Sequence, residues 1–242
     1  MKHSQLMVPF LEKVIVEMGL NFTEEQLGLF ARYDDFLIDN NMRVNLTRIT
    51  DPCEVAVKHF GDSFTILTQG ILPQGASVID VGTGAGFPGI PLAISRPDLQ
   101  ITLVDSLRKR IAFLDELIQL LGLSNVTLVW GRAEELGQNP QYREQFDVVI
   151  ARAVAPLNVL AELCLPLAKM KGRFIAMKGP KADEEVEAAA NALKAVGGKL
   201  LVTNVIVLPL LSEMRTLVHI IKCNLTPRGY PRKAGTPERQ PI

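Results

Sequence analysis

A glycine-rich segment constrains the fold more than any other part of the chain. Residues 78–91 read V-I-D-V-G-T-G-A-G-F-P-G-I-P, so an apolar strand that carries Asp80 would turn through alternating glycines into a helix. A strand, turn and helix of this kind form the first crossover of a parallel α/β sheet, where the turn holds a nucleotide-type cofactor. Asp105 closes the next apolar run, residues 101–105, and we expect it to bind the ribose of that cofactor.

The register of the glycines distinguishes two classes of cofactor. Residues 84–89 satisfy the dinucleotide pattern G-x-G-x-x-G, and Asp105 lies 21 residues (105 − 84) beyond the first of these glycines, near the spacing of NAD sites. The glycines begin earlier, however, at Gly82, so that Pro88 and Pro91 fall in the first turn of the helix. Proline has no N–H, and a pyrophosphate needs the free N–H groups of that turn. We therefore expect the cofactor to be S-adenosylmethionine, which has no phosphate. A P-loop is excluded because no Lys-Ser or Lys-Thr follows the glycines.

Two further strand ends complete the expected cofactor crevice. Residues 128–134 predict a third strand and a polar turn against the adenine, and residues 146–152 predict a fourth strand that ends at Arg152. Ligands of open α/β sheets bind outside the carboxyl ends of the strands, so the charged residues there should converge on one crevice, with Asp80 facing the cofactor's ammonium group. The expected cofactor-binding residues are Asp80, Gly82, Gly84, Phe87, Asp105, Ser106, Ala133, Glu134 and Arg152.

Several segments together resemble one family. They are Asn45-Leu46-Thr47, Asp51-Pro52, residues 59–63, residues 80–91, residues 105–110, Arg152-Ala153-Val154, Lys178-Gly179 and the tail from Thr226 to Pro237. Over nearly the whole chain they resemble the small-subunit (16S) ribosomal RNA guanine-N7 methyltransferases, also called the glucose-inhibited division protein B family. The resemblance implies methyl transfer from S-adenosylmethionine to N7 of one guanine, in that RNA or in an assembly intermediate of the small subunit. It also implies that Asn45 and His59 lie near the target base.

The expected chemistry is simple because guanine N7 has an exposed lone pair and no proton to lose, so that no general base is required. Positioning of the two reactants should supply most of the catalysis. His59 and Arg152 are the candidate catalytic side chains, although a lone histidine on a helical segment is more often a structural hydrogen-bonder than a catalyst. The fourth strand is followed by neither Asn-Pro-Pro-Tyr nor Pro-Cys, the signatures of amino-group and cytosine-C5 enzymes. Three alternatives stay open: a methyltransferase for another RNA, an NAD-dependent oxidoreductase, and a catalytically silent RNA-binding factor.

Charge is distributed unevenly, although the net charge of the chain is zero. Residues 1–70 carry ten acids and six bases, and residues 222–242 carry five bases against one acid. A basic tail rich in proline and glycine is expected to follow an RNA backbone through Arg228, Arg232 and Lys233, with Tyr230 as a stacking platform. The other interpretation is a solvated tail. Lys178, at the end of the fifth strand, is expected either to meet an RNA phosphate or to be a solvated lysine.

The predicted fold class is a doubly wound, mostly parallel class I methyltransferase sheet with an N-terminal helical extension. We expect the extension in residues 1–70, the core in 71–222 and the tail in 223–242, with residues 40–48 as a loop over the crevice. Helices are predicted at 87–95, 107–121, 157–168 and 182–196, and strands at 101–104, 126–130, 146–150, 173–177, 199–208 and 215–221. The last two strands follow each other directly, so one strand should be antiparallel.

Composition bounds the setting of the protein. The three cysteines are widely spaced, without a C-x-x-C pair, which favours a reducing cytoplasm and no metal site. The N-terminal residues lack the apolar region of a signal peptide, and the most apolar run, 200–211, is too short and interrupted for a membrane span. We expect a monomer.

Overall fold

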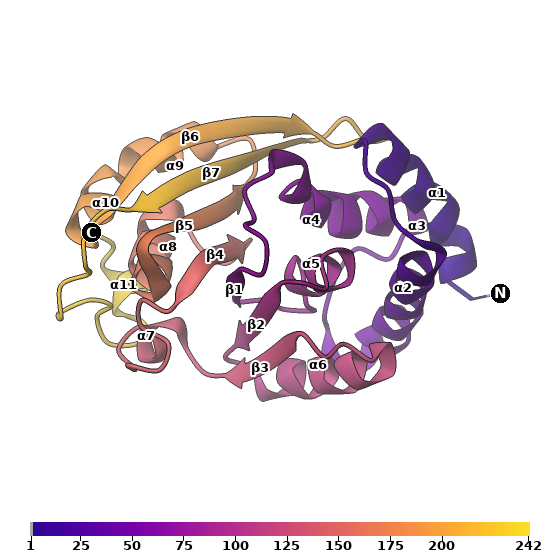
Figure 1. Ribbon diagram of the computed structural model, residues 1–242, viewed down its shortest axis with the longest axis horizontal. Helices are drawn as coiled ribbons and strands as arrows, with labels where there is room; N and C mark the ends of the chain where they lie inside the picture. The colour runs from indigo at the N-terminus through magenta and orange to yellow at the C-terminus, as the bar shows by residue number, and fades with distance from the viewer. Residues whose placement is uncertain (1) are drawn as a thin grey trace.

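A computed structural model describes residues 2–242 of the chain as a seven-stranded sheet between helices (Figure 1). The strand order is β3-β2-β1-β4-β5-β7-β6, and β7 is antiparallel to both of its neighbours while the other neighbouring strands pair in parallel. The doubly wound sheet with one antiparallel strand is therefore confirmed. The strands are β1 (Ser77–Val81), β2 (Gln100–Asp105), β3 (Val126–Trp130), β4 (Phe146–Arg152), β5 (Ala168–Lys178), β6 (Gly198–Val207) and β7 (Met214–Lys222).

Helices cover both faces of the sheet. The α-helices are α1 (Ser4–Glu17), α2 (Glu24–Val44), α3 (Pro52–Glu54), α4 (Asp62–Phe64), α5 (Gly89–Ser95), α6 (Arg108–Leu121), α7 (Ala133–Leu136), α8 (Leu157–Cys164), α9 (Ala182–Ala188), α10 (Ala190–Ala195) and α11 (Thr236–Arg239). Alternate strand residues point to opposite faces, so Val78 joins a core with α1, α2, α5 and α6, whereas Ile79 joins a core with α8 and α10.

The N-terminal extension packs through an apolar stripe of α1. Met7, Leu11 and Val14 of this helix are fully buried, and Thr23 and Gln26 form a capping box at the start of α2. The loop expected at 40–48 is wrong, because α2 continues to Val44. The side-chain oxygen of Asn41 accepts hydrogen bonds from the backbone N–H groups of residues 46 and 47, which holds the chain in a short turn at the end of the helix.

Three elements differ from the prediction, and local chemistry explains the first difference. Helix α8 ends at Cys164 and a 3₁₀ turn, Leu165–Leu167, follows, since Pro166 cannot continue an α-helix. Strand β5 then begins at Ala168, five residues before the predicted start (173 − 168). The predicted helix 182–196 is two short helices, α9 and α10, which meet at Ala189.

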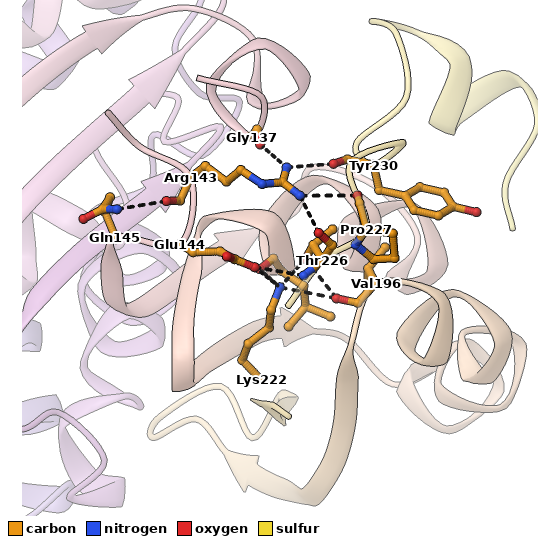
Figure 2. A network of polar contacts seen from close by, with 10 residues as sticks. Gly137, Arg143, Glu144, Gln145, Val196, Lys222, Thr226, Pro227 and Tyr230 are labelled. Atoms are coloured by element: carbon orange, nitrogen blue, oxygen red, sulfur yellow. Dashed lines mark hydrogen bonds and ion pairs between the residues drawn. The ribbon is translucent and has the colours of Figure 1, made fainter. Parts of the chain in front are cut away.

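The C-terminal tail lies against the sheet domain, so the expectation of a free tail is wrong. The Arg143 guanidinium donates hydrogen bonds to the carbonyl oxygens of Gly137, Thr226, Pro227 and Tyr230, which hold the start of the tail in place (Figure 2).

The end of β7 fixes the tail from the other side. The Lys222 side chain is fully buried and donates to the carbonyl oxygens of Leu165 and Val196 and to the Thr226 hydroxyl, near Glu144 (Figure 2). Burial lowers the pKa of Lys222 to about 8. This lysine counted as a tail cation in the sequence, but it is part of the core.

Candidate functional site

The glycine turn has the backbone conformation that its sequence predicts. Gly82 and Gly84 have φ of 71° and 63°, in the left-handed region that favours glycine. Asp80 lies beneath the turn, fully buried, where one carboxylate oxygen accepts from the Thr83 hydroxyl (2.7 Å) and from the Gly89 N–H (3.0 Å). Burial raises the pKa of Asp80 to about 6. Asp80 thus fixes the turn to the start of α5.

A first pocket, here called the Asp105 pocket, opens beside this turn at the carboxyl ends of β1, β2 and β3. Its volume is about 110 Å³. It is lined by Val81, Gly82, Val104, Asp105, Ser106, Gly131, Arg132, Ala133, Glu134, Val154, Leu163 and Glu238. The structure therefore brings together five residues of the predicted cofactor set, namely Gly82, Asp105, Ser106, Ala133 and Glu134.

Asp105 is the centre of the polar contacts in this pocket. One carboxylate oxygen accepts from the Gly84 N–H and from Arg110, both at 3.1 Å, and the other accepts from the Leu107 N–H at 2.9 Å. The carboxylate thus connects the glycine turn to the start of α6. The Asp105 residue is 3% exposed.

Besides these five, the Asp105 pocket is lined by seven residues that the sequence did not predict, among them Arg132, Val154 and Glu238. Glu238 comes from α11, and the neighbouring Gly235 N–H donates to Glu134 at 2.8 Å, so the tail closes one side of the pocket. A Cβ added at Gly82 would lie 2.6 Å from a methyl carbon of Val154, so Val154 packs directly onto the glycine turn. No pattern in the sequence indicates that Val154 or Glu238 reaches this site.

A second pocket, here called the Arg152 pocket, has a volume of about 460 Å³ and lies between the N-terminal segment and the ends of β4, β5 and β7. It is lined by Ile49, Lys58, His59, Asp62, Arg152, Ala153, Met177, Lys178, Gly179, Glu185 and Arg215.

Arg152 lies in this second pocket and does not converge with Asp105 and Glu134, contrary to the expectation of one crevice. Its guanidinium donates to the Asp62 carboxylate at 3.0 Å and to the Lys58 carbonyl at 3.1 Å. Arg152 lies there because its ion-pair partner, Asp62, belongs to the N-terminal extension and holds the guanidinium on that side.

The His59 ring, which lines the Arg152 pocket, stacks on the buried ring of Phe87. Their ring centroids are 4.5 Å apart, and the other face of Phe87 stacks on Tyr33 at 4.9 Å. Phe87 is thus part of the core and does not line the Asp105 pocket, where the sequence placed it. Nε2 of His59 bonds to the Thr47 hydroxyl at 2.8 Å. Burial, with the nearby charge of Arg152, lowers the pKa of His59 to about 3, so the ring is neutral near pH 7.

The remaining expected RNA contacts have different surroundings. Lys178 is 9% exposed, and its ammonium donates to Glu185 at 2.7 Å and to the Ala155 carbonyl at 2.6 Å, so it is neither solvated nor free. Asn45 is exposed at the end of α2 with φ of 53° and is not a lining residue of the Arg152 pocket.

The three tail cations fall into two groups. Arg228 and Lys233 are exposed. The Arg232 guanidinium makes a bidentate pair with Glu162 of α8, at distances from 2.6 to 3.1 Å, and Glu162 is 1% exposed. Tyr230 packs against the core on the α8 face, so its ring is not a free platform.

Two consecutive residues separate the pockets. Ala153 lines the Arg152 pocket and Val154 lines the Asp105 pocket, and Ala153 has φ of 54°, an uncommon conformation for a residue with a Cβ. Ligands in the two pockets would meet across this short segment. The arrangement suits transfer of a small group between two bound molecules.

Comparison with known proteins agrees with this geometry. The chain matches the family described as rRNA small subunit methyltransferase G over residues 26–212. A relative from Lactobacillus delbrueckii subsp. bulgaricus, named ribosomal RNA small subunit methyltransferase G, is 55% identical over 215 residues, which are 88% of this chain and 90% of the relative. The chain belongs to the rRNA small subunit methyltransferase G family. In this family member the matched residues include every lining residue of the two pockets except Arg215 and Glu238.

Solved structures with a similar fold include methyltransferases. A mutant of the 16S rRNA (adenine(1408)-N(1))-methyltransferase from Catenulisporales acidiphilia has a TM-score of 0.53 at 15% identity, over 67% of this chain and 92% of that one. TYW2 from M. jannaschii, solved in complex with AdoMet, has a TM-score of 0.51 at 17% identity, over 66% and 74% of the two chains. At these identities the likeness shows that this rRNA small subunit methyltransferase G family member has the class I methyltransferase fold.

Two classes of site are absent from the part of the chain that the structure describes. Among residues 2–242, no group of three or more His, Cys, Asp or Glu side chains could hold a metal ion. No helix within the same residues is long and apolar enough to cross a membrane.

Proposed function

We propose that the protein transfers the methyl group of S-adenosylmethionine to N7 of a specific guanine in small-subunit (16S) ribosomal RNA. The observation that carries the proposal is the Asp105 pocket, which joins a glycine turn to an acid at the end of the next strand, in a chain of the rRNA small subunit methyltransferase G family. The cofactor occupies the Asp105 pocket, and the target base occupies the Arg152 pocket.

The charges that line the Asp105 pocket fit this cofactor. The pocket carries three carboxylates, Asp105, Glu134 and Glu238, and one guanidinium, Arg132. S-adenosylmethionine has a sulfonium, an ammonium and one carboxylate, so it is a net cation that such a lining attracts. A dinucleotide would bring two negative phosphates to the same carboxylates, at a turn whose Pro88 and Pro91 lack N–H groups. The lining therefore argues against the oxidoreductase alternative.

The volume of the Asp105 pocket requires one local movement. Sites for drug-sized ligands measure roughly 300–1,000 Å³, whereas this pocket measures about 110 Å³. Val154 is the side chain that narrows it at the glycine turn, and it is 38% exposed, so it has room to move outward. We infer that Val154 turns away from Gly82 when the amino-acid part of the cofactor binds.

The Arg152 pocket can hold a target base without abstracting a proton from it. The bound cofactor supplies an electrophilic methyl group, and N7 of guanine supplies an unshared electron pair. His59, with a pKa of about 3 and a ring stacked on Phe87, is a poor base. The side chains around the pocket would instead hold the base in line with the methyl group, the role that positioning has in such displacements.

The partner and setting follow as parts of the same proposal. The substrate is the ribosomal RNA, either free or within an assembly intermediate of the small subunit, and the protein acts as a monomer in the cytoplasm. Asn45, Arg228 and Lys233 are proposed RNA contacts outside the pocket, and Lys178, whose ammonium is paired with Glu185, would meet an RNA phosphate only if that pair opens. The four bases that line the Arg152 pocket, Lys58, Arg152, Lys178 and Arg215, favour a polyanion on this side.

Mass mapping of modified nucleotides tests the proposal. Small-subunit RNA from cells with and without the protein is digested and compared, and purified protein with labelled S-adenosylmethionine is then added to RNA from the deficient cells. We expect one 7-methylguanosine to disappear in the deficient cells and to return on addition of the protein. A methyl group on another atom or another RNA would refute the assignment, and no transfer at all would favour a catalytically silent RNA-binding protein.

A further inference from the structure

Asp62 is an acidic residue in the pocket that we propose binds a base of the RNA, where most of the charged lining is basic. It begins α4, is 5% exposed, and lines the Arg152 pocket. One carboxylate oxygen, Oδ2, accepts a hydrogen bond from Arg152 at 3.0 Å. The other, Oδ1, is buried and has no hydrogen-bond partner among residues 2–242, although Nε of Arg215 lies 3.5 Å away, within ion-pair range.

A buried carboxylate oxygen without a donor carries a substantial free-energy penalty, and native structures usually provide a partner for such an atom. An ionised carboxylate can only accept hydrogen bonds, so the missing partner of Asp62 is an N–H or O–H donor. The pocket volume of about 460 Å³ is within the range of ligand sites, and Ile49 and Met177 give its lining apolar surface for the faces of a planar ring. Because Oδ1 is covered in this structure, a base held in the pocket can supply the donor once a neighbouring side chain, such as that of Arg215, moves aside.

Guanine is the base whose edge matches this arrangement. Its Watson–Crick edge carries two adjacent donors, N1–H and the N2 amino group, next to the O6 acceptor. Enzymes that extrude a base from RNA or DNA read it through hydrogen bonds to that edge. A carboxylate beside a guanidinium presents the complementary order of acceptor and donor, and Asp62 and Arg152 are such a neighbouring pair.

We propose that Asp62 is a specificity-determining residue, which accepts the N1–H and N2–H groups of the target guanine while Arg152 donates to O6. This inference rests on the proposed function and names how the same site selects its base. In this binding mode N7 lies on the edge of the ring beyond O6, away from the donors that Asp62 holds. Arg152 is followed directly by Ala153 and Val154, the residues between the two pockets, so the O6 and N7 side of the base would face the cofactor.

The inference distinguishes guanine from its close analogue inosine. Inosine keeps O6, N1–H and N7 but lacks the N2 amino group, so it loses one charge-assisted hydrogen bond to Asp62. Loss of such a bond corresponds to a preference for guanine of roughly 10- to 100-fold. Adenine, which has neither the N1–H donor nor O6, should be rejected more strongly.

The experiment compares small subunits rebuilt around RNA that carries either guanosine or inosine at the mapped nucleotide. Single-turnover methylation is measured for the wild type, Asp62→Asn, Asp62→Ala and Glu213→Gln. Glu213 pairs with Arg215 and Lys58 in the same charge network, but it is not a lining residue of the pocket, so its variant is the matched control. The expected result is a 10- to 100-fold preference for guanosine in the wild type and in Glu213→Gln, and little or no preference in both Asp62 variants.

A structural role for Asp62 gives a different result. If Asp62 only held Arg152 and Arg215 in place, its variants would slow both substrates alike and keep the preference, which would overturn the inference, as would a wild type that does not discriminate. Where a variant is too slow to assay, equilibrium binding of the two RNAs in the presence of S-adenosylhomocysteine gives the same ratio. Failure of the proposed function is separate, because the wild type would then not methylate N7 of guanosine at all.

Discussion

The two pockets at the carboxyl end of the sheet differ in both construction and charge. The Asp105 pocket is built around successive strand ends, and its lining is mostly acidic. The Arg152 pocket needs the N-terminal segment, which contributes Lys58, His59 and Asp62, and its lining is mostly basic. In the proposed assignment, the cationic cofactor and the polyanionic RNA would each meet a pocket whose charged lining is mainly of the opposite sign, with two residues between the pockets.

The difference teaches how one sheet edge can serve two ligands. The Asp105 pocket lies mainly at the ends of three neighbouring parallel strands, where open α/β sheets bind their ligands, whereas the Arg152 pocket depends on what is added to the core. The comparison predicts that variants of one pocket affect one ligand and leave the affinity for the other unchanged.

Gly82→Asp should have the largest effect on this comparison. The new side chain would meet Val154 in a backbone conformation that strains any residue with a Cβ, and it would place a charge beside the cofactor's carboxylate. We expect no measurable binding of S-adenosylmethionine by calorimetry, with unchanged RNA affinity. Gly122→Asp is the matched control, because Gly122 has φ of 67°, open space around its Cβ position and a place remote from both pockets. Normal cofactor binding by Gly82→Asp would remove the Asp105 pocket as the cofactor site.

Arg232→Ala should have the next largest effect, which is on stability. It loosens the tail, and of the two pockets the tail lines the Asp105 pocket alone. It would remove the guanidinium from the buried Glu162 carboxylate and leave only the backbone N–H of residue 232 as a donor, which costs about 3 kcal/mol, the low end for a broken buried pair, because Arg232 is 27% exposed. Thermal unfolding should therefore shift down by roughly 6–12 °C. Arg228→Ala, at an exposed neighbour, should unfold like the wild type. Equal melting temperatures of the two variants would show that the tail is not held by this pair.

Asp105→Ala should weaken cofactor binding less severely. Loss of hydrogen bonds from the ribose to a charged group costs on the order of 1.5–3 kcal/mol, or roughly 10- to 150-fold in affinity. Trp130 is the single tryptophan, and its indole N–H donates to the carbonyl of Ser106, so its fluorescence reports on this pocket. RNA affinity should stay at the wild-type value. An unaltered cofactor titration would contradict the ribose assignment.

The double variant Arg228→Ala with Lys233→Ala tests whether the tail shares RNA binding with the Arg152 pocket. Each lost phosphate contact should flatten the plot of log affinity against log salt by roughly 0.7–0.9. Arg232 is left intact because its charge is already paired with Glu162. If the slope and affinity match those of the wild type, the RNA surface consists of the Arg152 pocket and its surroundings, including Arg43 and Arg48.

The smallest expected effect is that of pH on the methyl-transfer step. At saturating RNA and cofactor the rate should be nearly flat from neutral to mildly alkaline pH, because N7 loses no proton and His59 is already neutral there. A rise of one log unit per pH unit would instead identify a required base. The lowered pKa of His59 affects stability at acid pH. The unfolded chain binds a proton at this histidine near its ordinary pKa of 6.5, whereas the folded chain binds it only near 3. The free energy of unfolding therefore falls as the pH drops from about 6.5 toward 3.

The sequence predicted those parts of the site that depend on neighbours along the chain. The glycine turn, Asp105 and Ala133-Glu134 follow directly after strands, so an alternating pattern and a parallel sheet suffice to bring them together. Arg152 was placed at the right strand end but in the wrong pocket, because its position depends on Asp62, 90 residues away along the chain. The tail was predicted free because its composition is that of a flexible segment. Its buried partners, Arg143 and Glu162, can be recognised only in the folded chain.

Docking of the tail has a practical consequence for handling the protein. Glu238 lines the Asp105 pocket close to the C-terminal end of the chain, and the two ends of the chain lie at opposite sides of the molecule (Figure 1). An affinity tag or fluorophore fused after Ile242 would be attached four residues beyond Glu238 and would therefore be close enough to the pocket to compete with ligands for access. The same fusion before α1 would leave both pockets open, which makes that end the one to use for immobilising the enzyme on a sensor surface.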